Sequence, residues 1–148
     1  MFPLHVTNHD YCQKPCDLPK TLGIDDWDQP ASFDYDAIML KLRDVQTCSP
    51  IVIIEGLFAF SHPPLVAEMH IRLFCEASMS ILLQRRAQRM YPDGAEGTWV
   101  EPEGYWDNIA WPNFVKYCGW DTTERLLIVD TNSDVDITAL LQKCALLQ

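Results

Sequence analysis

Short apolar runs alternate with amphipathic stretches along the chain. Four runs have the length and composition of strands, at residues 4–8, 51–56, 70–76 and 125–130. Four longer stretches are interpreted as helices, at residues 33–45, 78–91, 105–118 and 133–148. Strands that alternate with helices indicate βαβ units. The pattern therefore predicts an α/β fold with a parallel sheet and helices on both of its faces.

Local signals mark the ends of the predicted helices. Asp34 and Ser78 are candidate N-caps of the first two helices, and Ser133 with Asp136 is a candidate capping pair for the last. Pro112 is expected to kink or split the third helix, because proline has no backbone N–H. The residues expected to point inward are Ile38, Leu42, Val45, Met79, Leu82 and Leu83.

The strand at residues 51–56 ends in an unusual way. Four β-branched residues, 51–54, run directly into Glu55 and Gly56. A short apolar run of this kind predicts a strand that is buried on both faces. A buried carboxylate is costly without a partner, whereas the carboxyl end of a strand in a parallel sheet is where ligands bind. Glu55 is therefore either a surface residue or part of a site.

Length and composition favour one domain spanning residues 1–148. The chain is 48% hydrophobic and 22% charged, which is enough to form a core. We expect no membrane span, because no stretch of about 18 apolar residues occurs. The beginning of the chain does not resemble a secretory signal, so the six cysteines are expected to be reduced thiols in the cytoplasm. A net charge of −10 argues against binding to nucleic acid or anionic lipid.

An acidic segment surrounds Trp27. Asp25, Asp26 and Asp28 are its neighbours, within a long proline-containing loop at residues 10–32. Such a segment is either a solvated turn or a planar ring beside a carboxylate, suited to stacking a flat base and binding a sugar hydroxyl. Spacing alone favours the solvated turn. Loops of this length are often binding segments or lids.

Two further groups of side chains could carry chemistry. Asp10 follows the first strand and is a candidate general base, although a lone aspartate is an unspecific signal. The nearby histidines and cysteines do not have the spacing of a zinc site. Arg85 and Arg89 share a helix face, and Arg86 lies beside them. In an acidic chain, this group of arginines favours an arginine-bearing lid that closes over phosphates. The alternative is a solvated basic face.

These segments occur together in one family. The stretches HDYCQKP, DDWDQPASFD, PIVIIEGLFAF, QRRAQRMY and TWVEPEGYWDNIAWPNFVKY resemble nicotinamide riboside kinases, within the uridine-kinase-like group of P-loop kinases. They cover nearly the whole chain in the expected order. The last stretch is the most specific, since it is more similar to nicotinamide riboside kinases than to uridine kinases. The resemblance implies a three-layer P-loop NTPase-like fold and a cytoplasmic enzyme, with the nucleus as a second possible location.

The resemblance also implies roles for individual residues. Asp10 matches the base that takes the proton of the substrate's 5′-hydroxyl, although His9 stands where the family has a second aspartate. Trp27 matches the aromatic residue on the nicotinamide ring, and Asp28 the carboxylate on the ribose. Glu55 matches the acidic residue near Mg²⁺, with ATP as co-substrate. The remaining implied residues are Arg85, Arg86 and Arg89 in a lid at residues 85–104, and Tyr91 in the substrate pocket.

One element of the family is missing from the sequence. Such kinases begin with a strand, the loop G-x-x-x-x-G-K-[ST] and a helix, and no such motif occurs here. We expect the chain to be a truncated form of a kinase that phosphorylates nicotinamide riboside, with residues 10–33 as its substrate-binding loop. A nucleoside-binding pseudokinase is the alternative, and a uridine or cytidine kinase is another. The oligomeric state stays open.

Overall fold

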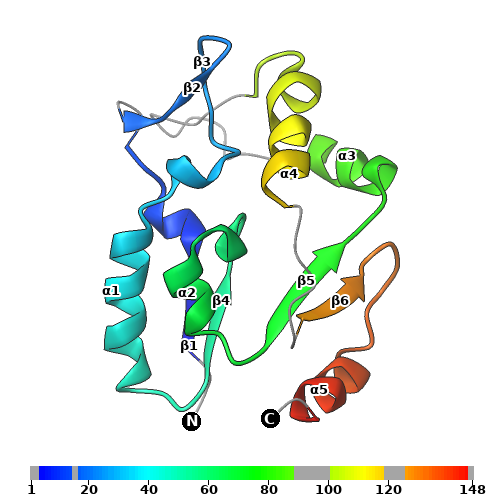
Figure 1. Ribbon diagram of the computed structural model, residues 1–148. Coiled ribbons are helices and arrows are strands. Elements are labelled where there is room, and N and C mark those ends of the chain that lie inside the picture. Colours follow the sequence, from blue (N-terminus) through cyan, green and yellow to red (C-terminus); the bar gives the residue numbers. More distant parts are fainter. Residues whose placement is uncertain (1–3, 15–16, 89–100, 119–125, 147–148) are drawn as a thin grey trace. The chain divides into compact units, whose positions relative to one another are not determined.

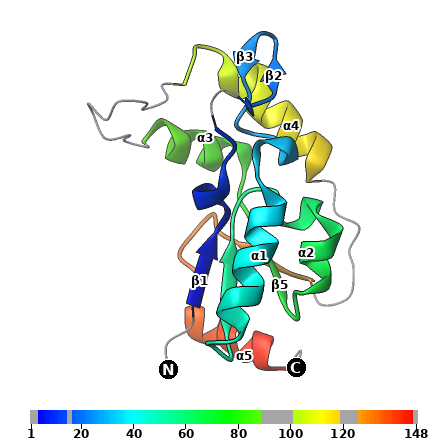
Figure 2. The same cartoon turned by 90° about the vertical axis from the view of Figure 1, so that its left-hand side faces the viewer.

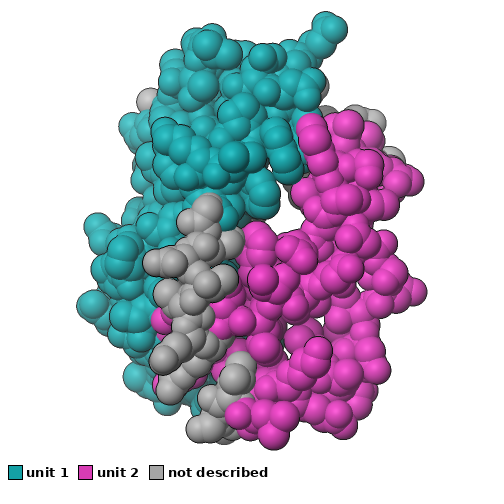
Figure 3. Space-filling model, turned by 45° about the vertical axis from the view of Figure 1, so that its right-hand side comes forward, with its two compact units in different colours: residues 1–68, 103–120 teal, residues 69–102, 121–148 magenta. Residues whose placement is uncertain are grey.

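The computed structural model describes residues 4–14, 17–88, 101–118 and 126–146, whose helices and strands are shown in Figure 1. It contains parallel strand pairs together with α-helices, so the predicted α/β class is confirmed. The chain divides into two compact units (Figure 3), residues 1–68 with 103–120 and residues 69–102 with 121–148. No helix within the described ranges is long and apolar enough to cross a membrane.

The first unit is built on a βαβ arrangement. Strand β1 (Leu4–Thr7) pairs in parallel with β4 (Val52–Glu55), and the connection between them contains α1 (Tyr35–Gln46). Helix α1 packs against β1 (Figure 2) and buries the predicted apolar residues Ile38, Leu42 and Val45. Asp34 caps the helix as predicted, because its Oδ1 accepts a hydrogen bond from the Ala37 N–H at 2.9 Å.

The predicted loop at residues 10–32 contains short regular elements. Strands β2 (Lys20–Thr21) and β3 (Ile24–Asp25) form an antiparallel hairpin. Both residues of its turn have positive φ, 54° at Leu22 and 79° at Gly23. A two-residue turn of this kind suits the twist of a hairpin. The sequence did not signal it, because leucine rarely adopts that conformation. Two 3₁₀ helices, η1 (Asn8–Tyr11) and η3 (Pro30–Ser32), lie on either side of the hairpin in sequence.

Helices also follow β4 and complete the first unit. The turn η4 (Ala59–Ser61) and helix α2 (Pro63–Ala67) come directly after that strand, and Leu65 of α2 is fully buried. Further along the chain, a π-helix η5 (Trp106–Ala110) continues into α4 (Trp111–Tyr117). The Trp111 N–H bonds to the Trp106 carbonyl, five residues earlier. The next residue, Pro112, lies in the first turn of α4 and has no N–H to donate. The backbone stays helical through Ala110 and Trp111, so the helix is not split here, and its hydrogen bonding changes from π to α instead.

The second unit also combines a pair of parallel strands with helices. Strand β5 (Arg72–Glu76) pairs in parallel with β6 (Leu126–Asp130), and α3 (Met79–Ala87) follows β5. Helix α5 (Ile137–Ala145) follows β6, and its N-cap is Asp136, which accepts a hydrogen bond from the Ala139 N–H at 3.0 Å. Ser133 lies outside this cap, so the predicted capping pair is reduced to Asp136.

The predictions about α3 were confirmed for the position of its N-cap and wrong for two of its inward-pointing residues. Ser78 occupies the N-cap position, but its side chain makes no capping hydrogen bond and lies 3.1 Å from the Ser80 hydroxyl. Met79 and Leu83, expected to point inward, are 42% and 45% exposed. The helical period identifies the apolar face of a helix, but it does not show whether another element covers that face.

The prediction that the strand at 51–56 is buried on both faces was also wrong. Exposure alternates along β4, and Ile53 is 50% exposed. Within the described part of the chain, β4 is paired with β1 in a sheet of two strands. Packing in the first unit covers one face of this pair more fully than the other, and an apolar sequence cannot reveal that difference.

Candidate functional site

The two predicted catalytic carboxylates follow paired strands of the first unit. Glu55 ends β4 and lies opposite Thr7, the last residue of β1, while Asp10 lies in η1, which follows β1 directly. Because the strands are parallel, both carboxylates belong to the carboxyl end of this pair. Both residues are exposed, so Glu55 is not a buried charge. The His5 Nε2 atom lies 4.0 Å from Glu55 Oε1, and each side chain is 57% exposed.

A close contact fixes the chain immediately after Glu55. The Asn8 side chain is buried, and its Nδ2 donates a hydrogen bond to the Leu57 carbonyl. Gly56 has a φ of 154°, and a Cβ atom at this position would come closer than 3.0 Å to the Asn8 side chain. Only glycine fits here. The segments that carry Asp10 and Glu55 therefore touch each other through Asn8 and Gly56.

Hydrogen bonds close the predicted substrate-binding loop, residues 10–33, at its base. The Asp34 N–H donates to the Tyr11 carbonyl at 2.8 Å, and the Gln13 N–H donates to the Ser32 carbonyl at 2.8 Å. Cys12 and Phe33 form an antiparallel bridge between these two bonds. The loop is thus a closed segment that begins beside Asp10 and carries Trp27 and Asp28.

Trp27 and Asp28 are held by a tyrosine from a distant part of the sequence. The Trp27 backbone N–H donates to the Tyr105 hydroxyl at 3.0 Å. Tyr105 is 1% exposed and Asp28 is 9% exposed. Burial raises the pKa of Tyr105, and the charge of Asp28 and a side-chain hydrogen bond with Asp28 raise this pKa further. The phenol therefore stays neutral near pH 7 and keeps its proton available to the Asp28 carboxylate.

The predicted lid arginines belong to the second unit, and two of them are described. Arg85 donates through Nη1 to the Thr131 hydroxyl at 3.2 Å and through Nη2 to the Thr131 carbonyl. Arg86 donates through Nε to Glu101 Oε2 at 2.6 Å, and their side chains are 13% and 26% exposed. Arg89 and Tyr91 lie outside the described residues. The phosphate-binding role of these arginines stays a prediction.

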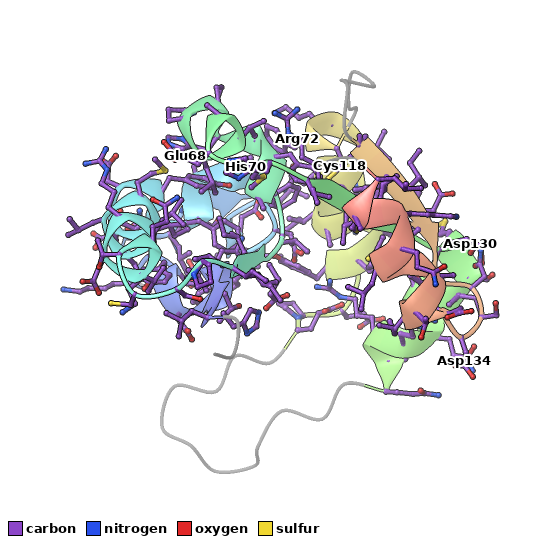
Figure 4. All side chains as sticks on the ribbon, turned by 90° about the horizontal axis from the view of Figure 1, so that it is seen from below. Glu68, His70, Arg72, Cys118, Asp130 and Asp134 are labelled. Atoms are coloured by element: carbon purple, nitrogen blue, oxygen red, sulfur yellow. The ribbon has the colours of Figure 1, made fainter. Side chains whose placement is uncertain are left out.

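The carboxyl ends of β5 and β6 are joined by the segment after β6. Thr131 donates through its N–H and its hydroxyl to the Glu76 carbonyl, at 2.8 and 2.9 Å. Asp130 Oδ1 accepts from the Asn132 N–H at 2.8 Å, and Asn132 Oδ1 accepts from the Ser78 N–H at 2.8 Å. Asp130 is exposed, and it is labelled together with Asp134 in Figure 4. Arg85 thus contacts a strand end that is already fixed by hydrogen bonds.

The described cysteines do not belong to a candidate metal centre among the described residues. The five described cysteines are free thiols. Burial raises the pKa of Cys118, labelled in Figure 4, to about 12, which leaves its thiol protonated near pH 7. The described residues contain no group of three histidine, cysteine or acidic side chains that could hold a metal ion.

Three residues of this site were not assigned a role from the sequence. Tyr105 and Asn113 lie in the segment with the strongest family resemblance, but only the structure shows that they contact the loop around Trp27. Asp26 was read only as one member of an acidic segment. The structure shows that it is fully buried. The spacing of Asp26 from Trp27 and Asp28 in the sequence does not indicate whether its side chain is buried or exposed.

Comparison with known proteins shows a distant similarity to a kinase. No protein-family model matches the chain. The chain is similar to a protein of Schizosaccharomyces pombe named nicotinamide riboside kinase. The two are 22% identical, and the aligned region covers 82% of this chain and 72% of the yeast protein. This similarity supports a distant relationship to a kinase.

Proposed function

We propose that this chain binds a nucleoside in the loop at residues 10–33, and that it acts as a kinase of the nicotinamide riboside type. The observation that carries the proposal is the arrangement of Trp27 and Asp28. An indole ring and a carboxylate, adjacent in sequence, are anchored by Tyr105. The distant kinase relative supports the same assignment.

In this proposal each residue has a distinct task. The Trp27 ring stacks on the flat base, which for nicotinamide riboside is a cationic ring attracted to the face of an indole. Asp28 accepts hydrogen bonds from the ribose hydroxyls. Asp10, exposed beside the base of the loop, accepts the proton of the 5′-hydroxyl. The reaction is transfer of a phosphoryl group from ATP to that oxygen, which gives nicotinamide mononucleotide.

The carboxylates at the strand ends fit a role beside Mg²⁺. Mg²⁺ takes oxygen ligands, and it is commonly bound by one or two carboxylates together with substrate phosphates and water. Asp10 and Glu55 provide exposed carboxylate oxygens at one end of the β1–β4 pair. The ion supplies charge neutralisation for the phosphates when it is bound, and Glu55 is the residue that we place nearest to it.

No segment of the sequence resembles the phosphate-binding loop that such kinases use for ATP. A P-loop cradles phosphates with backbone N–H groups and a lysine, and the 148 residues contain no G-x-x-x-x-G-K-[ST] motif. This observation favours a second candidate function, nucleoside binding without turnover. The two candidates share the loop at residues 10–33 and differ in whether ATP is bound and consumed.

Calorimetry with separate ligands distinguishes these functions. We expect the chain to bind nicotinamide riboside more tightly than uridine or cytidine, and Trp27→Ala to weaken that binding. Asp28→Asn should weaken it too, whereas Asp25→Asn should not, since Asp25 forms an exposed ion pair with Lys20. Tighter binding of uridine, or unchanged affinity in Trp27→Ala, would reject the nicotinamide riboside assignment.

A coupled assay of ATP consumption then tests the kinase assignment. Turnover that is stopped by Asp10→Asn and retained by Asp17→Asn, an exposed aspartate of the same loop, supports a catalytic Asp10. Binding of nicotinamide riboside with neither binding nor consumption of Mg²⁺–ATP supports the binding-only function for this chain. Turnover that survives Asp10→Asn would remove Asp10 from the mechanism.

A further inference from the structure

The proposed function leaves one buried ionisable side chain without a task. Asp26 is fully buried, while its neighbour Asp25 is partly exposed and lies beside the Lys20 ammonium. Burying a carboxylate costs several kcal/mol unless charges or hydrogen bonds compensate for the lost hydration. In a solvated turn the Asp26 carboxylate would be hydrated. In the structure it is enclosed by residues of the first unit.

Hydrogen bonds from separate segments converge on the Asp26 carboxylate. Oδ2 accepts from the Thr21 hydroxyl at 2.6 Å, from Gln29 Nε2 at 2.8 Å and from Asn113 Nδ2 at 2.9 Å. Oδ1 accepts from the Asp28 N–H at 3.0 Å. Thr21 belongs to the hairpin, Asn113 belongs to α4, and the other two donors belong to the loop itself.

The backbone of Asp26 is fixed as well. Its N–H donates to the Pro19 carbonyl at 2.8 Å, and its carbonyl accepts from the Ser32 hydroxyl at 2.5 Å. With the Trp27 N–H bonded to Tyr105, every residue from Asp26 to Asp28 has its backbone N–H in a hydrogen bond. The indole and the Asp28 carboxylate therefore start from a backbone with little freedom to rotate.

The hydrogen bonds around Asp26 require an acceptor group that carries no hydrogen atoms. All four donors that reach the side chain of Asp26 are neutral N–H or O–H groups. An ionised carboxylate accepts from several donors at once, whereas the amide of asparagine has one oxygen and two N–H donors of its own. Replacing Asp26 by asparagine would turn an N–H group toward donors, although the shape of the side chain hardly changes.

We infer that Asp26 is a positioning residue for the nucleoside site, acting through the backbone of Asp28 and through Asn113 of α4. This inference rests on the proposed function, since it assigns Trp27 and Asp28 to the ligand. Asp26 does not touch the ligand itself. It sets the orientation of the two residues that do, and it ties their loop to the helix that follows Tyr105.

The test compares Asp26→Asn with Asp25→Asn, the same chemical change one residue away. Two quantities are measured: the affinity for nicotinamide riboside by calorimetry, and the fluorescence of Trp27. The Trp27 emission is isolated as the difference between each protein and its Trp27→Phe version, because the chain has five tryptophans. Circular dichroism confirms that each variant is folded.

We expect Asp26→Asn to bind nicotinamide riboside about tenfold more weakly, equivalent to ~1.4 kcal/mol, and to shift the Trp27 emission to longer wavelength. Asp25→Asn should change neither quantity. If Asp26→Asn does not fold, Asn113→Ala removes only one of the four donors and should shift both quantities in the same direction by a smaller factor.

Two results would overturn the inference. One is an unchanged Trp27 emission in folded Asp26→Asn, or in Asn113→Ala where that variant replaces it. The other is an equal loss of affinity in Asp25→Asn. A wild-type chain that binds no nicotinamide riboside would refute the proposed function instead. The emission of Trp27 would still decide whether Asp26 positions it, because that measurement needs no ligand.

Discussion

Gly56→Ala is the substitution whose effect follows most directly from the structure. Gly56 separates the predicted Mg²⁺-proximal Glu55 from Leu57, and its φ is 154°. The methyl group of alanine would come closer than 3.0 Å to the buried side chain of Asn8. Because real Cβ atoms do not approach other atoms so closely, either Asn8 or the backbone has to move.

The expected cost combines two effects. Holding an L-residue at this φ costs about 1–3 kcal/mol. Displacing Asn8 breaks its hydrogen bond to the Leu57 carbonyl and leaves buried polar groups unsatisfied, which costs about 1–3 kcal/mol more. We therefore expect Gly56→Ala to lower the free energy of unfolding by roughly 2–6 kcal/mol, a large part of the stability of a small domain.

Urea unfolding followed by circular dichroism measures this loss, and Gly23→Ala is the matched control. Gly23 also has a positive φ, 79°, but a Cβ atom there would meet nothing within 4 Å. Its substitution should cost only the backbone strain, about 1–2 kcal/mol. The double variant Asn8→Ala, Gly56→Ala should recover part of the loss relative to the sum of the single variants.

The reasoning is refuted if Gly56→Ala costs no more than Gly23→Ala, or if the Asn8 and Gly56 effects simply add. Additivity would mean that the two residues do not meet in the folded protein. In that case the contact between the segments carrying Asp10 and Glu55 would have to be withdrawn.

Three more predictions concern groups with shifted pKa values. Tyr105→Phe removes the hydroxyl that accepts from the Trp27 N–H, so nicotinamide riboside affinity measured by calorimetry should fall several-fold, and unchanged affinity would contradict the anchoring role. At pH 8 iodoacetamide should label exposed Cys48 well before Cys118, because a pKa of about 12 leaves roughly one Cys118 thiol in ten thousand ionised; mass spectrometry of a time course checks this. Stability should fall as the pH rises from 9 toward 12, since the unfolded chain releases the Cys118 proton first, and urea titrations should show a shallower fall for Cys118→Ala.

The elements of this protein could be read from its sequence to a large extent. Strands form in all four predicted runs, at 4–8, 51–56, 70–76 and 125–130, because short runs of apolar residues between polar segments favour extended structure. The first helix begins at its predicted cap, Asp34, and buries its predicted face. At Pro112, which was predicted to kink or split the third helix, the chain stays helical and passes from π to α hydrogen bonding.

The candidate site was only partly visible in the sequence. The family resemblance selected Asp10, Trp27, Asp28 and Glu55, whose roles stay predictions. It also selected the loop at residues 10–33, which hydrogen bonds close at its base. It did not distinguish Asp26 from Asp25, although one is fully buried and the other pairs with an exposed lysine. Adjacent aspartates have the same intrinsic preferences, so only the surrounding donors can separate them.

The sequence by itself determined which segments become strands and helices, since hydrophobic period, capping and proline act over a few residues. Only the tertiary structure decided where charges lie. It left Glu55 exposed at the end of an apolar strand, and it brought Tyr105 and Asn113 against a loop about 80 residues earlier in the chain. Burial and hydrogen-bond partners depend on residues that are distant in sequence, and no local pattern specifies them.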